Sequence, residues 1–174
     1  HGTRFLAAMP TNLYGPGDNY DLQNSHVLPA LIRKMHEAKK RAGREVVVWG
    51  SGHPRREFLY SDDMAEACLA LMQLPDAEFE LLIAPHLAAT GTVPLPPLIN
   101  IGCGTDLTVR ELAETIAKVV GFGGELKFDP TKPDGAPCKR LDVSRLFRLG
   151  WRPKTGLHEG IVLAYKDYQA ALNA

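Results

Sequence analysis

His26 stands where a helix is expected to begin, in the segment Asn24-Ser25-His26. Imidazole titrates near neutral pH, so a histidine beside a loop of hydrogen-bonding groups can donate a proton to a bound substrate. A histidine at such a place can also simply cap or pack the helix, and residue spacing alone favours that structural role. The segment therefore provides a candidate acid with a structural alternative.

The segment VVVWGSGHPRREF, from Val46 to Phe58, combines an aromatic side chain with two cations. Trp49 closes an expected strand, and Arg55 and Arg56 follow shortly after it. An indole face can stack on a nucleotide base, and a guanidinium can bind phosphate through two parallel hydrogen bonds. A nucleoside diphosphate would use both groups, although a core tryptophan beside a solvated arginine pair explains the pattern equally well.

Two other segments carry weaker signals. In INIGCGTDLTVREL, Gly102 and Gly104 lack the third glycine of a dinucleotide-binding loop, so a plain strand-to-helix turn is the better interpretation. The loop TKPDGAPCKRLD is charged, with Lys132, Asp134, Lys139 and Arg140. A carboxylate there could bond ribose hydroxyls, yet solvated charges are the usual arrangement. The six histidines match no metal-binding spacing, and we predict no metal site.

Composition and charge narrow the class of protein. The chain has 174 residues, of which 45% are hydrophobic, enough for a core of ordinary domain size. Twenty basic residues balance twenty acidic ones, so no net charge favours binding to nucleic acid or to a membrane surface. No apolar run reaches the roughly 18 residues of a membrane-spanning helix. Three widely spaced cysteines predict reduced thiols in a cytoplasmic protein, without disulfides or a zinc site.

The residues that could carry chemistry are expected at the ends of alternating strands and helices. Strands are predicted over residues 4–9, 45–49, 57–60, 98–101 and 125–128. Helices are predicted over about 26–42, 63–73, 109–120, 143–148 and 157–171. Alternation of this kind is typical of an α/β fold.

Local signals define several of these boundaries. The strand over 4–9 is apolar and is expected to be buried, and Asn24 or Ser25 is expected to cap the helix over 26–42. Capping boxes are predicted for Asp63 with Glu66 and for Thr108 with Glu111, and Gly121 is expected to end the second of these helices. Five prolines within 75–97 predict an irregular surface segment.

Four segments, taken in order, resemble the extended short-chain dehydrogenase/reductase family and its members that act on GDP-sugars. They are MPTNLYGPGDN, NSHVLPALIRK, VVVWGSGHPRREFL and KPDGAP. The resemblance implies the C-terminal, substrate-binding part of a Rossmann-type reductase, as a single region over 1–174. Residues 1–15 and 98–120 are then expected to return to the parallel Rossmann sheet, and 26–60 to form much of a smaller substrate-binding lobe.

The resemblance also implies a two-stage reaction, in which GDP-4-dehydro-6-deoxy-D-mannose is epimerised at C3 and C5 and then reduced at C4 by NADPH. His26 matches the general acid of the epimerisations and is also expected near the cofactor. The segment beside the nicotinamide part of NADP comprises Pro10, Thr11, Asn12 and Leu13. The positions that match the GDP-sugar site are Lys34, Trp49, Arg56 and Asp134.

Some features of the family are not found in these residues. The glycine-rich dinucleotide loop, the Tyr-x-x-x-Lys pair and the cysteine base would precede His1, so we expect a fragment, inactive alone, of a homodimeric enzyme. Two alternatives remain open from the residues themselves. One is another epimerase or dehydratase of the family, acting on a UDP- or dTDP-sugar, and the other is a non-catalytic nucleotide-sugar-binding module.

Overall fold

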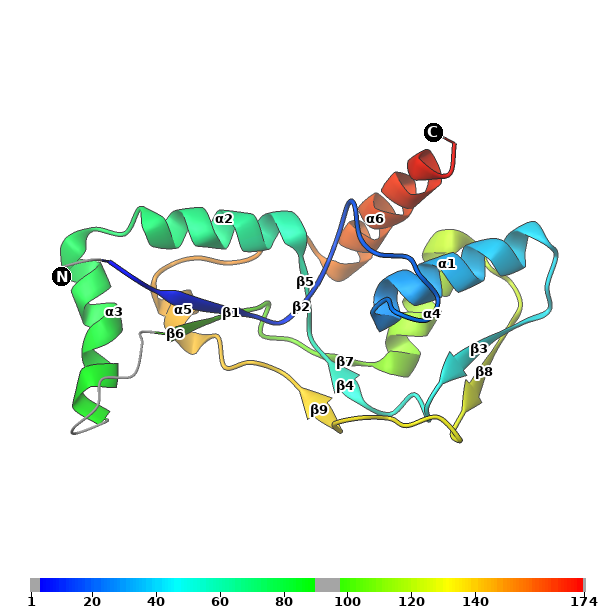
Figure 1. Ribbon diagram of the computed structural model, residues 1–174, viewed down its shortest axis with the longest axis horizontal. Coiled ribbons are helices and arrows are strands. Elements are labelled where there is room, and N and C mark those ends of the chain that lie inside the picture. The colour runs from blue at the N-terminus through cyan, green and yellow to red at the C-terminus, as the bar shows by residue number, and fades with distance from the viewer. Residues whose placement is uncertain (1–3, 90–97, 174) are drawn as a thin grey trace.

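The computed structural model describes residues 4–89 and 98–173 (Figure 1). Its helices are α1 (Val27–Lys40), α2 (Ser61–Met72), α3 (Asp76–Ala89), α4 (Val109–Val120), α5 (Ser144–Arg148) and α6 (Leu157–Ala171). Its strands are β1 (Ala7–Pro10), β2 (Asn12–Tyr14), β3 (Glu45–Trp49), β4 (Arg55–Arg56), β5 (Phe58–Tyr60), β6 (Leu98–Ile101), β7 (Leu107–Thr108), β8 (Glu125–Asp129) and β9 (Cys138–Lys139). The predicted α/β class is confirmed. In the described ranges, no helix has the length and apolar character needed to span a membrane.

Parallel pairing joins segments that are far apart in the sequence. β1 pairs in parallel with β6, from Ala7 opposite Leu98 to Pro10 opposite Ile101, so the two strands lie in one parallel sheet as predicted. β2 pairs in parallel with β5, and β3 with β8. The short strand β4 lies between β7 and β9.

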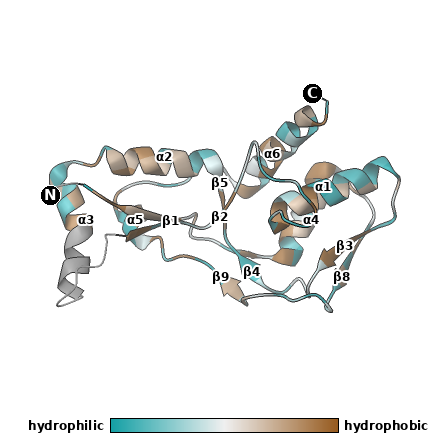
Figure 2. Ribbon diagram, in the orientation of Figure 1, coloured by the Kyte–Doolittle hydropathy of each residue, from teal (hydrophilic) through white to brown (hydrophobic). Residues whose placement is uncertain are grey.

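Buried hydrophobic side chains form two clusters, and the helices that contribute to them lie on either side of β5 (Figures 1 and 2). Side chains alternate in direction along a strand, and β5 therefore contributes Phe58 and Tyr60 to the larger cluster but Leu59 to the smaller one. The larger cluster includes residues of α1, α4 and α6, and the smaller one includes residues of α2, α5 and β6. Within residues 98–120, β6 thus lies beside β1, whereas α4 packs against α1.

The capping box and the terminal glycine predicted for α4 are both confirmed. The Thr108 hydroxyl accepts the backbone N–H of Glu111 at 3.1 Å, and the Glu111 carboxylate accepts the backbone N–H of Thr108 at 2.7 Å. Gly121 follows the helix in the left-handed conformation, with φ of 72°. Both ends of α4 are therefore determined by residues next to them in the sequence.

Two capping predictions are wrong. Neither Asn24 nor Ser25 caps α1, because the residue at the cap position is His26. Asp63 does not cap α2, which begins two residues earlier at Ser61. Instead, the buried Asp63 carboxylate accepts the backbone N–H groups of Lys154 and Thr155 at 3.2 and 3.0 Å. The Asp63 carboxylate, which a capping box would have used at the start of α2, therefore binds a distant segment instead.

Two predictions about exposure and regularity are also wrong. The strand β1 is exposed along all four residues, because it pairs only with β6 within the described part of the chain. Much of the expected irregular segment over 75–97 is the helix α3, and residues 90–97 lie outside the described residues. Alanine and leucine favour helix, but the apolar residues of α3 do not gather on one face, so no helical period marks the segment.

Candidate functional site

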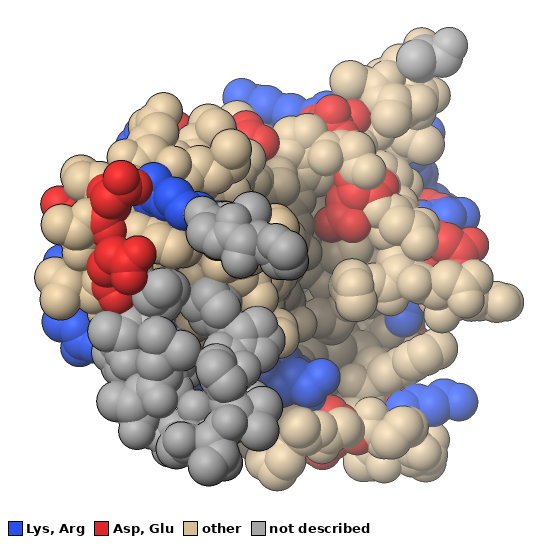
Figure 3. All heavy atoms as spheres, turned by 60° about the vertical axis from the view of Figure 1, so that its left-hand side comes forward, with Lys and Arg blue, Asp and Glu red and all other residues tan. Residues whose placement is uncertain are grey.

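The first cleft lies at the carboxyl end of β1, where parallel sheets commonly place ligands. It has a volume of about 690 Å³ and is lined by Pro10, Thr11, Asn12, Leu13, Asp18, His26, Lys139, Arg140 and Leu141. The four residues predicted beside the nicotinamide and the predicted acid therefore line one cavity. The face of the molecule drawn in Figure 3 is hollowed near its centre, with charged side chains of both signs around the hollow.

The chain that follows β1 is held in place by its own polar side chains. The Thr11 backbone N–H donates to the carbonyl of Ile101 at 3.0 Å. The Thr11 hydroxyl and the Asn12 amide both donate to the carbonyl of Glu57, at 3.1 and 2.7 Å. One wall of the first cleft is therefore fixed to the segment that joins β4 and β5.

His26 is exposed at the first turn of α1, and its side chain makes no capping hydrogen bond. The capping alternative for this residue therefore has no support in the geometry. Asp18 lines the same cleft, and burial raises the pKa of its carboxyl, while the backbone N–H of Asn19 and the nearby His26 oppose that shift. The first cleft thus holds an accessible imidazole beside a partly desolvated carboxyl group.

Lys139 and Arg140, whose sequence pattern favoured solvated charges, also line the first cleft, from β9 and the residue that follows it. β9 pairs in parallel with β4 and places Lys139 opposite Arg56. Strands of two residues are too short to show a period, so only the three-dimensional structure reveals this wall. Its two cations suit an anionic group such as a phosphate.

The second cleft has a volume of about 240 Å³ and brings the four predicted GDP-sugar residues together. Its lining comprises Leu22, Gln23, Ser25, Val27, Ala30, Leu31, Lys34, Val48, Trp49, Arg56, Val109, Pro133 and Asp134. The two clefts are adjacent, because the consecutive residues Ser25 and His26 line one each.

Trp49 gives the second cleft an aromatic surface flanked by cations. Its side chain is 55% exposed, and the Nζ atoms of Lys34 and Lys132 lie 5.0 and 5.6 Å from its ring centroid. Burial lowers the pKa of Lys34, whose ammonium also donates to the carbonyl of Val47 at 3.3 Å. An indole with neighbouring ammonium groups suits a base attached to a phosphate chain.

Arg56 and Asp134 hold the loop that closes the second cleft. Arg56 donates to the carbonyls of Ala136 and Asp134, at 2.7 and 3.2 Å, and to its neighbour Arg55 at 2.8 Å. The Asp134 carboxylate accepts the Ser51 hydroxyl and backbone N–H, each at 2.7 Å, and these bonds lower its pKa. The hydroxyl contact predicted for Asp134 would therefore compete with Ser51.

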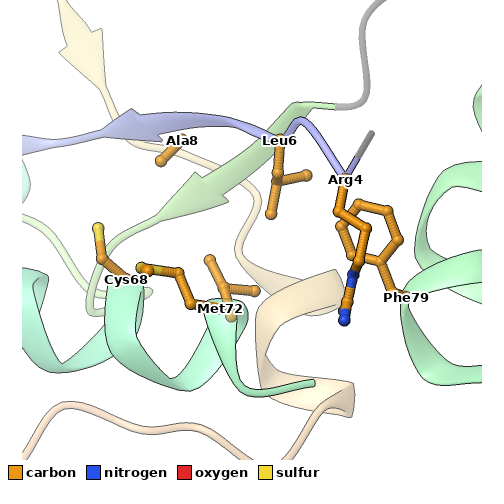
Figure 4. Close-up of a pocket in the computed structure, with 7 residues that line it drawn as sticks. Arg4, Leu6, Ala8, Cys68, Met72 and Phe79 are labelled. Atoms are coloured by element: carbon orange, nitrogen blue, oxygen red, sulfur yellow. The ribbon is translucent and has the colours of Figure 1, made fainter. Parts of the chain in front are cut away.

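A third, apolar pocket of about 410 Å³ lies beside β1 and α2 and contains none of the predicted site residues. Leu6, Ala8, Cys68 and Met72 line it, and the Arg4 guanidinium lies 4.5 Å from the centroid of the Phe79 ring (Figure 4). Among the residues that the structure describes, no group of three or more His, Cys, Asp or Glu side chains could hold a metal ion.

Comparison with known proteins supports the resemblance read from the motifs. Residues 1–83 match the NAD dependent epimerase/dehydratase family. GDP-L-fucose synthase of Escherichia coli (strain K12) is 49% identical over 166 residues, which are 95% of this chain and 49% of that protein. Probable GDP-L-fucose synthase 1 of Oryza sativa subsp. japonica is 48% identical over 168 residues, 97% of this chain and 46% of that protein.

A solved structure shows the same arrangement of elements. The GDP-L-fucose synthetase from Naegleria fowleri bound to NADP superposes with a TM-score of 0.78 at 26% identity, covering 98% of this chain and 48% of that one. The chain therefore spans about half the length of the relatives that it matches. The predicted resemblance is confirmed for proteins that are named GDP-L-fucose synthase.

Proposed function

We propose that this chain is the substrate-binding part of a GDP-L-fucose synthase of the NAD dependent epimerase/dehydratase family. The full-length enzyme, in which a dinucleotide-binding half precedes this chain, converts GDP-4-dehydro-6-deoxy-D-mannose to GDP-L-fucose by 3,5-epimerisation and NADPH-dependent reduction at C4. One observation carries the proposal. Lys34, Trp49, Arg56 and Asp134 line one cleft, directly beside the cleft that contains His26.

The GDP part of the substrate is assigned to the second cleft. Trp49 offers an exposed indole face for the guanine, and Lys34 and Arg56 supply positive charge for the diphosphate. Lys139 lines the first cleft and supplies a further positive charge close to where the sugar would bind. The sugar would then enter the first cleft, within reach of His26.

The cofactor is assigned to the first cleft, and the residues there suit it. Pro10 and Leu13 provide apolar contacts and Thr11 and Asn12 polar ones, as a nicotinamide with its ring and its amide requires. When bound, NADPH supplies the hydride for C4. His26 holds the proton that the epimerised carbon receives, and the cleft walls orient the sugar ring between the two.

The full-length enzyme is also proposed to be cytoplasmic and homodimeric. The three cysteines are free thiols, which suits a reducing compartment. The dimer rests on the resemblance to the reductase family alone.

The proposal is tested by incubating the full-length enzyme with GDP-4-dehydro-6-deoxy-D-mannose and NADPH. We expect oxidation of NADPH together with formation of GDP-L-fucose, and no turnover by residues 1–174 alone, which serve as the control. A reduced product that keeps the original configuration at C3 and C5 would contradict the assignment to a synthase.

A further inference from the structure

Glu57 is one of two buried charged side chains in the described part of the chain, and its exposed fraction is 0%. It lies between β4 and β5, at the boundary between the two clusters. Its Oε1 atom accepts the backbone N–H of Gly104 at 2.7 Å, and its Oε2 atom accepts that of Leu141 at 2.8 Å. Burial of a carboxylate is costly unless its oxygens are hydrogen bonded, and here each has a partner.

The main chain of Glu57 makes hydrogen bonds to residues that line the first cleft. Its carbonyl accepts the side chains of Thr11 and Asn12, and its N–H donates to the carbonyl of Lys139 at 3.2 Å. Thr11 and Asn12 line the first cleft from the segment that follows β1, and Lys139 and Leu141 line it from β9 and the residues after it; we call these two segments the walls of the cleft. Glu57 therefore connects the wall that contains Thr11 and Asn12 to the wall that contains Lys139 and Leu141.

The glycine pair that does not form a dinucleotide loop makes room for this carboxylate. A Cβ atom at Gly102 would overlap Oε1 of Glu57 and lie 2.9 Å from its Cδ. Gly104 adopts a left-handed conformation, with φ of 77°, and its N–H donates to the carboxylate. Gly102 is thus explained by the position of Glu57, and Gly104 by its left-handed conformation.

We propose that Glu57 is a positioning residue, which fixes the separation of the two walls of the first cleft. The inference rests on the proposed function, because that separation matters for a sugar held between NADPH and His26. A displacement of about 1 Å in such a site is enough to slow a reaction severely. Substrate affinity should depend on Glu57 much less, since the GDP contacts lie in the second cleft.

Glu57→Gln keeps the shape of the side chain but turns one acceptor into a donor that faces a backbone N–H. In residues 1–174, we expect faster hydrogen exchange at the amide of Gly104 or Leu141, with unchanged exchange in α4. In the full-length enzyme, we expect kcat to fall about tenfold, the worth of one hydrogen bond to a charged group, with KM for the GDP-sugar within about twofold.

Gly102→Ala should reproduce this pattern without changing Glu57, and Gly123→Ala is its matched control, because nothing lies within 4 Å of a Cβ there. The double variant Glu57→Gln/Gly102→Ala should lose little more than either single variant, since both act through one contact.

Wild-type exchange at both amides in Glu57→Gln, or a raised KM with unchanged kcat, would overturn the positioning role. The hydrogen-exchange measurement does not depend on enzymatic turnover. If the wild-type enzyme formed no GDP-L-fucose, the proposed function would fail, while the amides would still show whether Glu57 joins the two walls.

Discussion

The His26→Gln variant of the full-length enzyme is expected to form GDP-L-fucose about 10²–10⁴-fold more slowly than the wild type, the usual contribution of a positioned acid. Its imidazole is exposed, lines the first cleft and makes no capping bond, so the substitution should leave α1 intact. Binding of the GDP-sugar should be retained, because the predicted binding residues line the second cleft.

The measurement is turnover and product stereochemistry at saturating NADPH. Exchange of solvent deuterium into C3 or C5 of the substrate is expected to persist in His26→Gln, since removing a proton requires the base and not the acid. His53→Gln is the matched control, because His53 is also exposed but lines neither cleft. A wild-type rate of GDP-L-fucose formation would show that His26 is structural.

The Arg56→Ala variant is expected to bind GDP more weakly by about 1.5–3 kcal/mol, which is about 10- to 150-fold in Kd. Arg56 lines the second cleft and also holds the carbonyls of Asp134 and Ala136. The substitution therefore removes a cation for the diphosphate and loosens the loop that closes the cleft. Isothermal titration of residues 1–174 with GDP measures the effect.

Two further variants identify the origin of that loss. Arg55→Ala removes the adjacent guanidinium, which bonds Asp106 and lines neither cleft, so GDP affinity should remain near the wild-type value. Ser51→Ala removes the hydroxyl that donates to the Asp134 carboxylate, and so loosens the same loop without removing the cation or a residue that lines the cleft. An equal loss in Arg56→Ala and Ser51→Ala would assign the effect to the loop, and an unchanged Kd in Arg56→Ala would exclude a phosphate contact.

The parts of the fold that were predictable from sequence are those determined by neighbouring residues. α4 has its capping box and terminal glycine within its own sequence, and β3 is a β-branched run that ends at a glycine. The prediction for Asp63 was wrong because a contact with residues 154 and 155 replaced the local one. α3 was missed because its apolar residues follow no period.

Some residues of the candidate site were likewise predictable from sequence motifs, and others were not. The motif resemblance named residues that the structure brings into two adjacent clefts, although their positions in the sequence extend from 10 to 134. Lys139 and Arg140 carried only a weak local signal and Glu57 carried none, because their positions depend on pairing and hydrogen bonds between distant segments. Contacts of this kind are set by the tertiary structure.

The most direct test of the central claim, that the second cleft binds the GDP part of a nucleotide sugar, is titration of residues 1–174 with GDP, UDP and dTDP under identical conditions. The purine is expected to stack on Trp49 while Lys34 and Arg56 contact the diphosphate, so GDP should bind at least about tenfold more tightly than either pyrimidine nucleotide. Equal affinities for the three nucleotides, or tighter binding of UDP or dTDP, would contradict the account.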